Sequence, residues 1–164
     1  MLRKFKIKNL QADQDGFTLI ELLVVIGILA ILLAVTLIAI NPNKHFQDSR
    51  NAQRQSNVSA ILDAIYEYES ANNGKIPPTL AAVDTTPKNI GLGTGSINIC
   101  TDLSPTYLAD IPTDPSAGSV TGGATPCAVG VTAYVSGYTI AVSNGRFSVA
   151  APNAEDGATI NVTR

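Results

Sequence analysis

The sequence predicts an α+β fold, in which a long N-terminal α-helix packs on a small C-terminal antiparallel β-sheet. Three observations predict it: an uninterrupted apolar run over residues 17–40, helical spacing of apolar residues in 43–72, and strand-like runs in 131–163. Hydrophobic residues make up 45% of the 164 residues, but the first run holds many of them. About 90 residues are left for a soluble core, which is small enough to benefit from a covalent cross-link.

Residues 1–16 are polar and basic, with four Lys or Arg residues against two Asp residues. They lack an apolar segment of their own, and no Ala-x-Ala site follows the apolar run, so an ordinary secretory signal is not indicated. Subtracting these residues from the chain's 11 basic and 13 acidic side chains leaves 7 and 11 after Gly16. That balance excludes the broad basic surface of a nucleic-acid-binding protein.

The run from Phe17 to Ile40 has one charged residue, Glu21. As an α-helix it would be about 36 Å long, which is enough to cross a bilayer. It is apolar on every face, so it predicts a membrane-spanning helix. The denser basic cluster precedes the run, which favours a cytoplasmic N-terminus and an outward C-terminus.

Residues 43–72 predict an amphipathic helix that continues outward from the membrane. Its apolar side chains share one face: Val58, Ile61, Ile65 and Tyr68. The charged side chains, Arg54 included, are assigned to the other faces. Pro42 interrupts the join with the apolar run, and Asn72-Asn73-Gly74 followed by Pro77-Pro78 ends the helix.

The rest of the chain predicts loops and strands. Residues 79–96 are expected to be mostly irregular and 112–130 to be a surface loop, with a short strand over 97–100. Four strand-like runs follow: Val131–Ser136, Tyr138–Ser143, Arg146–Ala150 and Ala158–Thr163. Asn144-Gly145 predicts a two-residue hairpin turn. The sheet is expected to pack on the apolar face of the amphipathic helix.

Gly16-Phe17-Thr18-Leu19-Ile20-Glu21, with the apolar residues 22–30 after it, strongly resembles the class III signal sequence of type IV pilins and type II secretion pseudopilins. In that family a membrane aspartyl protease, the prepilin peptidase, cuts after the glycine and methylates the new N-terminus. The resemblance implies cleavage between Gly16 and Phe17, N-methylation of Phe17, and a role for Glu21 in assembly. Residues 107–115, Tyr-Leu-Ala-Asp-Ile-Pro-Thr-Asp-Pro, also resemble a loop of bacterial pseudopilin-like chains.

The resemblance implies a pilin-like ladle with four parts. These are a cleaved leader (1–16), a transmembrane and filament-core helix (17–41), its amphipathic continuation (42–73) and an extracytoplasmic β-rich head (74–164). It implies a structural subunit, not an enzyme, that polymerises into a type IV pilus-like filament for adhesion, motility or DNA uptake. The alternatives are a pseudopilin of a type II secretion system and, in a different class, a singly anchored surface binding protein that does not polymerise.

The resemblance also implies partners and location. We expect a homopolymer formed through the N-terminal helix, the prepilin peptidase, and an assembly machinery with its own ATPases. Nucleic acid is expected only as cargo during uptake. The precursor is expected in the cytoplasmic membrane as a single-pass protein, and the mature subunit in a filament at the cell surface.

The two cysteines, Cys100 and Cys127, predict a disulfide if the head is exported, and two buried free thiols are the alternative. By chain-entropy reasoning, the loop that this bond closes would stabilise the folded head by roughly 3.5 kcal/mol. No cofactor, metal site or catalytic residue is predicted. His45 is the only histidine, and the spacing of Asp102, Asp110 and Asp114 is not that of an EF-hand.

Overall fold

The structure, a computed structural model, describes residues 16–164. The predicted leader therefore lies outside the described residues, apart from Gly16. Residue contacts divide the chain into two compact units, Met1–Pro42 and Asn43–Arg164.

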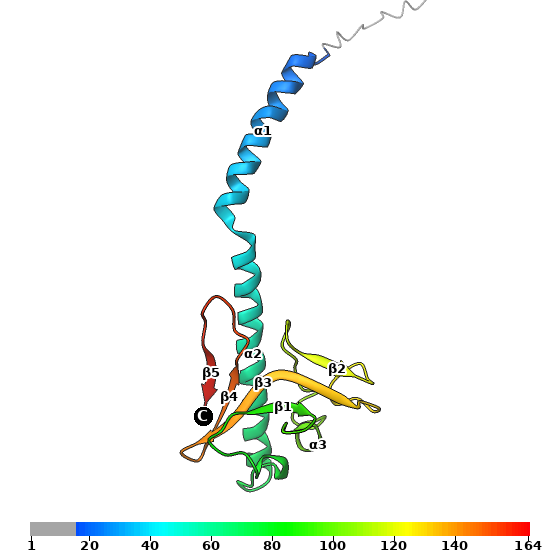
Figure 1. The fold of residues 1–164 in the computed structure, drawn as a ribbon, viewed down its shortest axis with the longest axis vertical. Coiled ribbons are helices and arrows are strands. Elements are labelled where there is room, and N and C mark those ends of the chain that lie inside the picture. The colour runs from blue at the N-terminus through cyan, green and yellow to red at the C-terminus, as the bar shows by residue number, and fades with distance from the viewer. Residues whose placement is uncertain (1–15) are drawn as a thin grey trace, which may run out of the picture. The chain divides into compact units, whose positions relative to one another are not determined.

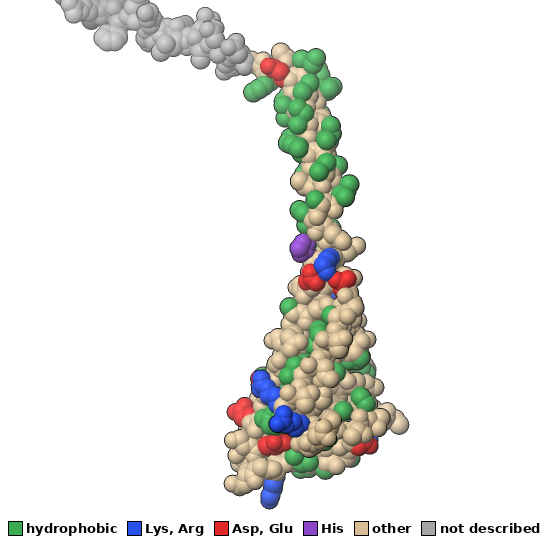
Figure 2. Space-filling view, turned by 90° about the vertical axis from the view of Figure 1, so that its left-hand side faces the viewer, with side chains coloured by type: hydrophobic (Ala, Val, Ile, Leu, Met, Phe, Trp, Pro, Cys, Tyr) green, Lys and Arg blue, Asp and Glu red, His purple; other side chains and the backbone are tan. Residues whose placement is uncertain are grey.

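The first unit contains helix α1 (Leu19–Ile40), which occupies most of the predicted apolar run. No residue of α1 is buried, and apolar side chains lie along the face of the helix that Figure 2 shows. The helix ends at Asn41, whose φ of 43° is left-handed. Asn is one of the few residues that tolerate this conformation at a helix end, and Pro42 then fits the first turn of the next helix.

The second unit is built on helix α2 (Pro42–Ala71). The predicted apolar face is confirmed, since Val58, Ile61 and Ile65 are fully buried. Tyr68, one turn further, packs edge-on against Tyr107 with ring centroids 5.3 Å apart. The helix ends where the sequence predicts, and the Gly74 N–H donates to the Glu69 carbonyl at 2.8 Å.

A five-stranded antiparallel sheet lies beside α2 within this unit (Figure 1). Its strands are β1 (Lys88–Leu92), β2 (Ser119–Thr121), β3 (Ala133–Ser143), β4 (Arg146–Ala151) and β5 (Ile160–Thr163). Strands run in the order β1-β3-β4-β5, and β2 pairs with the first residues of β3. Two short helices, η1 (Pro78–Leu80) and α3 (Cys100–Leu103), lie in the connections.

The core forms between α2 and one face of the sheet. Alternate residues of β3 are buried: Tyr134, Ser136, Tyr138 and Ile140. The three apolar ones join one cluster with Phe147 and Val149 of β4 and with the apolar face of α2. The predicted α+β fold, a helix packed on a small antiparallel sheet, is therefore confirmed.

The hairpin turn at Asn144-Gly145 is also confirmed. Both residues have positive φ, 52° and 74°, and Ser143 pairs with Arg146 across the turn. A tight turn with two left-handed residues matches the twist of the strands that it joins.

The strand predictions before this turn need correction. The two runs expected over 131–136 and 138–143 form one strand, β3, which begins at Ala133 and continues through Gly137 at a φ of 83°. The strand expected over 97–100 is wrong, because Ile97 makes only an isolated bridge to Ile90 and α3 begins at Cys100.

Segments expected to be irregular contribute β1 and β2. Both pair with β3, so their hydrogen-bonding partners come from a distant part of the chain. A Cβ on Gly91 would lie 2.6 Å from the Tyr134 carbonyl oxygen. Gly91 is thus needed for the close approach of two strands, in a segment expected to be irregular.

The predicted disulfide is confirmed. Cys100 and Cys127 are bonded, with their Cα atoms 5.4 Å apart, and they join α3 to the connection between β2 and β3. The Cys127 N–H donates to the Asp110 carboxylate at 3.0 Å. The bond and the carboxylate together fix this connection on the head.

Candidate processing and assembly site

Gly16 and Phe17 precede α1 in a non-helical segment. Phe17 is 82% exposed, and a Cβ built on Gly16 would meet no atom within 4 Å. The peptide bond between these residues therefore lies outside the helix and beside open space, as a protease that must reach it requires.

Thr18 and Glu21 form a reciprocal capping box at the start of α1. The Glu21 N–H donates to the Thr18 hydroxyl at 3.3 Å. In return, Oε2 of Glu21 accepts the Thr18 N–H at 2.8 Å and the Thr18 O–H at 2.7 Å. Two of the backbone donors that a helix start leaves free are satisfied in this way.

The pattern Thr-x-x-Glu is typical of such a box, but Thr18 was not among the predicted site residues. Negative charge is also favoured at a helix N-terminus, where the backbone N–H groups point outward. The capping box alone therefore accounts for the placement of the Glu21 carboxylate, without a contact from another subunit.

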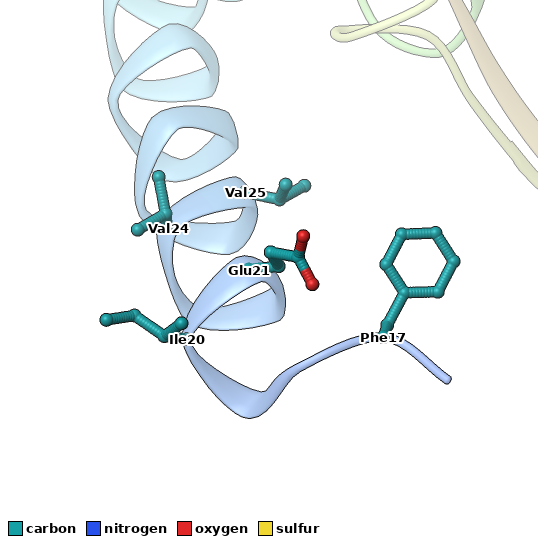
Figure 3. Close-up of a pocket in the computed structure, with 5 residues that line it drawn as sticks. All are labelled: Phe17, Ile20, Glu21, Val24 and Val25. Atoms are coloured by element: carbon teal, nitrogen blue, oxygen red, sulfur yellow. The ribbon is translucent and has the colours of Figure 1, made fainter. Parts of the chain in front are cut away.

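An open hollow beside Glu21 is otherwise apolar. It is lined by Phe17, Ile20, Glu21, Val24 and Val25. In Figure 3 the Glu21 carboxylate points to the side on which the Phe17 ring lies. The structure thus brings Phe17 and Glu21, two of the predicted site residues, to one side of the helix start.

One helix among the described residues is long and apolar enough to cross a membrane, by length and composition. The window that meets this test is not buried at all. Apolar side chains on every face of α1 therefore need lipid or other apolar helices around them.

The second unit contains a buried polar centre that was not among the predicted sites. Arg54 and Asp114 are fully buried at the side chain and form a bidentate ion pair, with Nε–Oδ2 at 2.7 Å and Nη2–Oδ1 at 3.2 Å. The assignment of Arg54 to a polar face is therefore wrong. A signal was available, because Arg54 lies one turn before Val58 on the apolar face.

Asp114 is held by several donors at once. Its Oδ1 accepts the backbone N–H groups of Ser116 and Ala117 at 2.8 and 2.9 Å, in addition to Arg54. Burial opposes ionisation of the carboxyl, but the Arg54 guanidinium and these N–H groups outweigh it and lower the pKa of Asp114 to about 2. The carboxylate is therefore charged at all physiological pH values.

Gly137 makes room for this pair. A Cβ at this position would lie 2.5 Å from the Asp114 Cβ, and the Asp114 N–H donates to the Ser136 carbonyl at 2.6 Å. The loop over 107–115 that resembles a pseudopilin segment is thus anchored to α2 by a side chain and to β3 by its backbone.

The other acidic residues weighed for metal binding have structural partners. Asp102 accepts the N–H and O–H of Thr79 at 2.9 and 2.7 Å, and Asp110 accepts the Cys127 N–H. Within residues 16–164, no three His, Cys, Asp or Glu side chains lie together as metal ligands. Among the described side chains, this leaves the helix start as the better candidate site.

Comparison with known proteins agrees with this location. Residues 11–37 match the family model for the prokaryotic N-terminal methylation motif. No curated protein and no solved structure matches the chain. The chain therefore carries the N-terminal methylation motif that is the signature of type IV pilins and pseudopilins, on a pilin-like α+β fold.

Proposed function

We propose that this chain is a prepilin, cleaved after Gly16, N-methylated at Phe17 and polymerised through α1 into a type IV pilus-like filament. One observation carries the proposal. The methylation motif over 11–37 overlaps a helix that has no buried residue and is apolar on every face. Such a helix suits a membrane-anchored precursor, and it also suits the centre of a polymer.

The physical argument rests on repetition. Each copy carries the same apolar helix, and a contact between two different faces of identical chains need not close on itself. Such a contact extends into a helical fibre. Neighbouring helices then replace lipid as the apolar surroundings of α1.

Glu21 is the proposed assembly residue. Cleavage creates a new positive amine at Phe17, and the Glu21 carboxylate of a neighbouring copy can pair with it in apolar surroundings. Oε1 of Glu21 accepts no hydrogen bond from the described residues, whereas Oε2 is used by Thr18. One oxygen is therefore available for such a pair without loss of the helix cap.

The proposed partners follow from this order of membrane anchoring, cleavage and polymerisation. A prepilin peptidase processes the precursor, which spans the cytoplasmic membrane with its N-terminus inside and its head outside. An assembly machinery with its own ATPases then extracts the subunit into the filament. The filament serves adhesion, motility or uptake of DNA as cargo, and this chain has a structural role in it.

A pseudopilin of a type II secretion system is the second candidate. The loop over 107–115 favours it, because this segment resembles a loop of pseudopilin-like chains. Abundance separates the two roles, since a major pilin is made in large amounts and a pseudopilin is not.

The test is mass analysis of material sheared from cells that produce the chain. We expect a chain that begins at N-methyl-Phe17, recovered in a high-molecular-weight fraction. Gly16→Trp is the control and is expected to accumulate as full-length precursor. A full-length wild-type chain found only in membranes would overturn the proposal and leave the singly anchored binding protein.

A further inference from the structure

Three basic residues follow the apolar run within fifteen positions: Lys44, Arg50 and Arg54. Each forms an ion pair with a carboxylate that lies at least sixty residues further along the chain. Two of the carboxylates, Glu155 and Asp156, belong to the connection between β4 and β5. The head therefore supplies counter-charges to the start of α2.

The connection between β4 and β5 is fixed on α2 by more than charge. Asn51 donates from Nδ2 to the Glu155 carbonyl at 2.9 Å, and the Glu155 N–H donates back to Asn51 Oδ1 at 3.0 Å. This reciprocal clip holds the backbone of Glu155 beside α2. The two acidic side chains are therefore placed against α2 independently of their own ionisation.

The ion pairs differ in exposure. Arg50 Nε donates to both carboxylate oxygens of Glu155, at 2.9 and 3.1 Å, and Arg54 donates to the same carboxylate at 3.2 Å. Lys44 pairs with Asp156 and, at 3.8 Å, with Asp48. Both partners of the Lys44–Asp156 pair are about half exposed, so this pair opens most easily.

These cations lie close to the membrane by chain length alone. Lys44 is four residues past Ile40, the last residue of α1, and Arg50 lies about 9 Å further along α2. Basic side chains at the surface of a bilayer are attracted to anionic lipid head groups. A subunit that must leave the bilayer would be held back by such contacts.

We propose that Glu155 and Asp156 form an acidic clamp that keeps Lys44 and Arg50 from binding the head groups of anionic lipids. The clamp rests on the proposed function, because it presumes a precursor anchored by α1. It explains why basic residues are present where an outward segment usually has few. The folded head offsets them with side chains that no local sequence pattern connects to α2.

The test uses the full-length, unprocessed chain in phosphatidylcholine vesicles that contain spin-labelled phosphatidylglycerol or phosphatidylcholine. The measured quantity is the selectivity of the protein for phosphatidylglycerol, relative to the wild type. Any contribution of residues 1–16 cancels in this ratio, because every variant contains them. Asp156→Asn, which leaves the Glu155 contacts in place, is expected to raise selectivity about fivefold, the effect of one freed cation.

Glu155→Gln/Asp156→Asn is expected to raise selectivity further, and added salt to abolish the gain. Glu67→Gln/Glu69→Gln is the matched control, with the same change in net charge farther along α2, and is expected to stay at the wild-type value. Adding Lys44→Gln and Arg50→Gln to the clamp variant should restore that value. Equal selectivity in the clamp and control variants overturns the proposal, as does a gain that survives loss of both cations.

This result is independent of processing and polymerisation. A chain that fails to form filaments still reports on the clamp in vesicles, and an ineffective clamp leaves the filament assay unchanged. The two proposals can therefore fail separately.

Discussion

Arg54 on α2 and Asp114 in the loop before β2 form a bidentate ion pair with no exposed side-chain surface. The two residues are sixty positions apart, and the pair joins the helix to a segment without regular structure. No buried polar side-chain atom among the described residues lacks a partner. The polar atoms of both side chains therefore have hydrogen-bond partners, and replacing either residue should lower the free energy of unfolding.

Asp114→Asn should destabilise the head by about 3 kcal/mol, because the buried Arg54 guanidinium loses its bidentate counter-charge and keeps only the partly exposed Glu155 carboxylate, at 3.2 Å. The measurement is denaturant unfolding of the full chain in detergent micelles, followed by tyrosine circular dichroism. Asp63→Asn is the matched control, since the pair of Asp63 with Arg164 is about half exposed. That variant should stay within about 1 kcal/mol of the wild type. Equal losses in both variants would contradict a buried role for Asp114.

Stability should also fall at low pH. The folded-state pKa of Asp114 is lowered from 3.8 to about 2, so its stabilisation is complete above pH 4 and is lost as the pH falls from about 4 to 2. The shift corresponds to about 2 kcal/mol. Unfolding curves of the wild type and Asp114→Asn, recorded between pH 5 and 2, should converge by that amount. Parallel curves would show that Asp114 titrates normally.

Gly137→Ala should be more damaging than an ordinary glycine substitution. The added Cβ would lie 2.5 Å from the Asp114 Cβ, at a backbone φ of 83°. Gly145→Ala is the control, because its φ of 74° imposes the same strain with open space around it. We expect the free energy of unfolding to fall by about 1 to 2 kcal/mol in the control and by about 3 kcal/mol in Gly137→Ala. Denaturant unfolding measures both. A cost no larger than that of Gly145→Ala would contradict the steric argument.

Thr18→Val should fray the start of α1, since the Glu21 N–H loses its acceptor. The expected cost is about 1 kcal/mol, or roughly a fivefold faster amide exchange at residues 19–22 in micelles. Thr18→Ser should restore protection. Thr36→Val is the control, because the Thr36 hydroxyl bonds only to the Leu33 carbonyl inside the helix. Unchanged exchange at the helix start would exclude a capping role in solution.

Glu21→Ala should leave processing intact and abolish polymerisation, because the amine at Phe17 of a neighbouring copy loses its proposed partner. Cells that produce this variant should yield the mature chain in membranes and none in the sheared fraction. Thr18→Ser, which retains the hydroxyl cap, should still polymerise. Normal filaments from Glu21→Ala would remove Glu21 from the assembly mechanism.

Local and periodic features of the sequence were sufficient for several parts of this protein. The apolar run, the apolar face of α2, the Asn144-Gly145 turn and the methylation motif each depend on residues close together in the chain. Their chemistry acts within one helix or one turn, so the pattern alone determines the element. The cysteine pair was predictable because the chain has only two.

Only the tertiary structure decided which distant segments meet. β1 and β2 are short and contain glycine or polar residues. They become strands because both form backbone hydrogen bonds with β3. Arg54 could not be placed from its charge, since burial is favourable only when Asp114 is present and Gly137 leaves space. The acidic clamp on α2 likewise depends on Glu155 and Asp156, more than a hundred positions away. Long-range contacts of this kind are decided by the whole packed chain, and no local pattern encodes them.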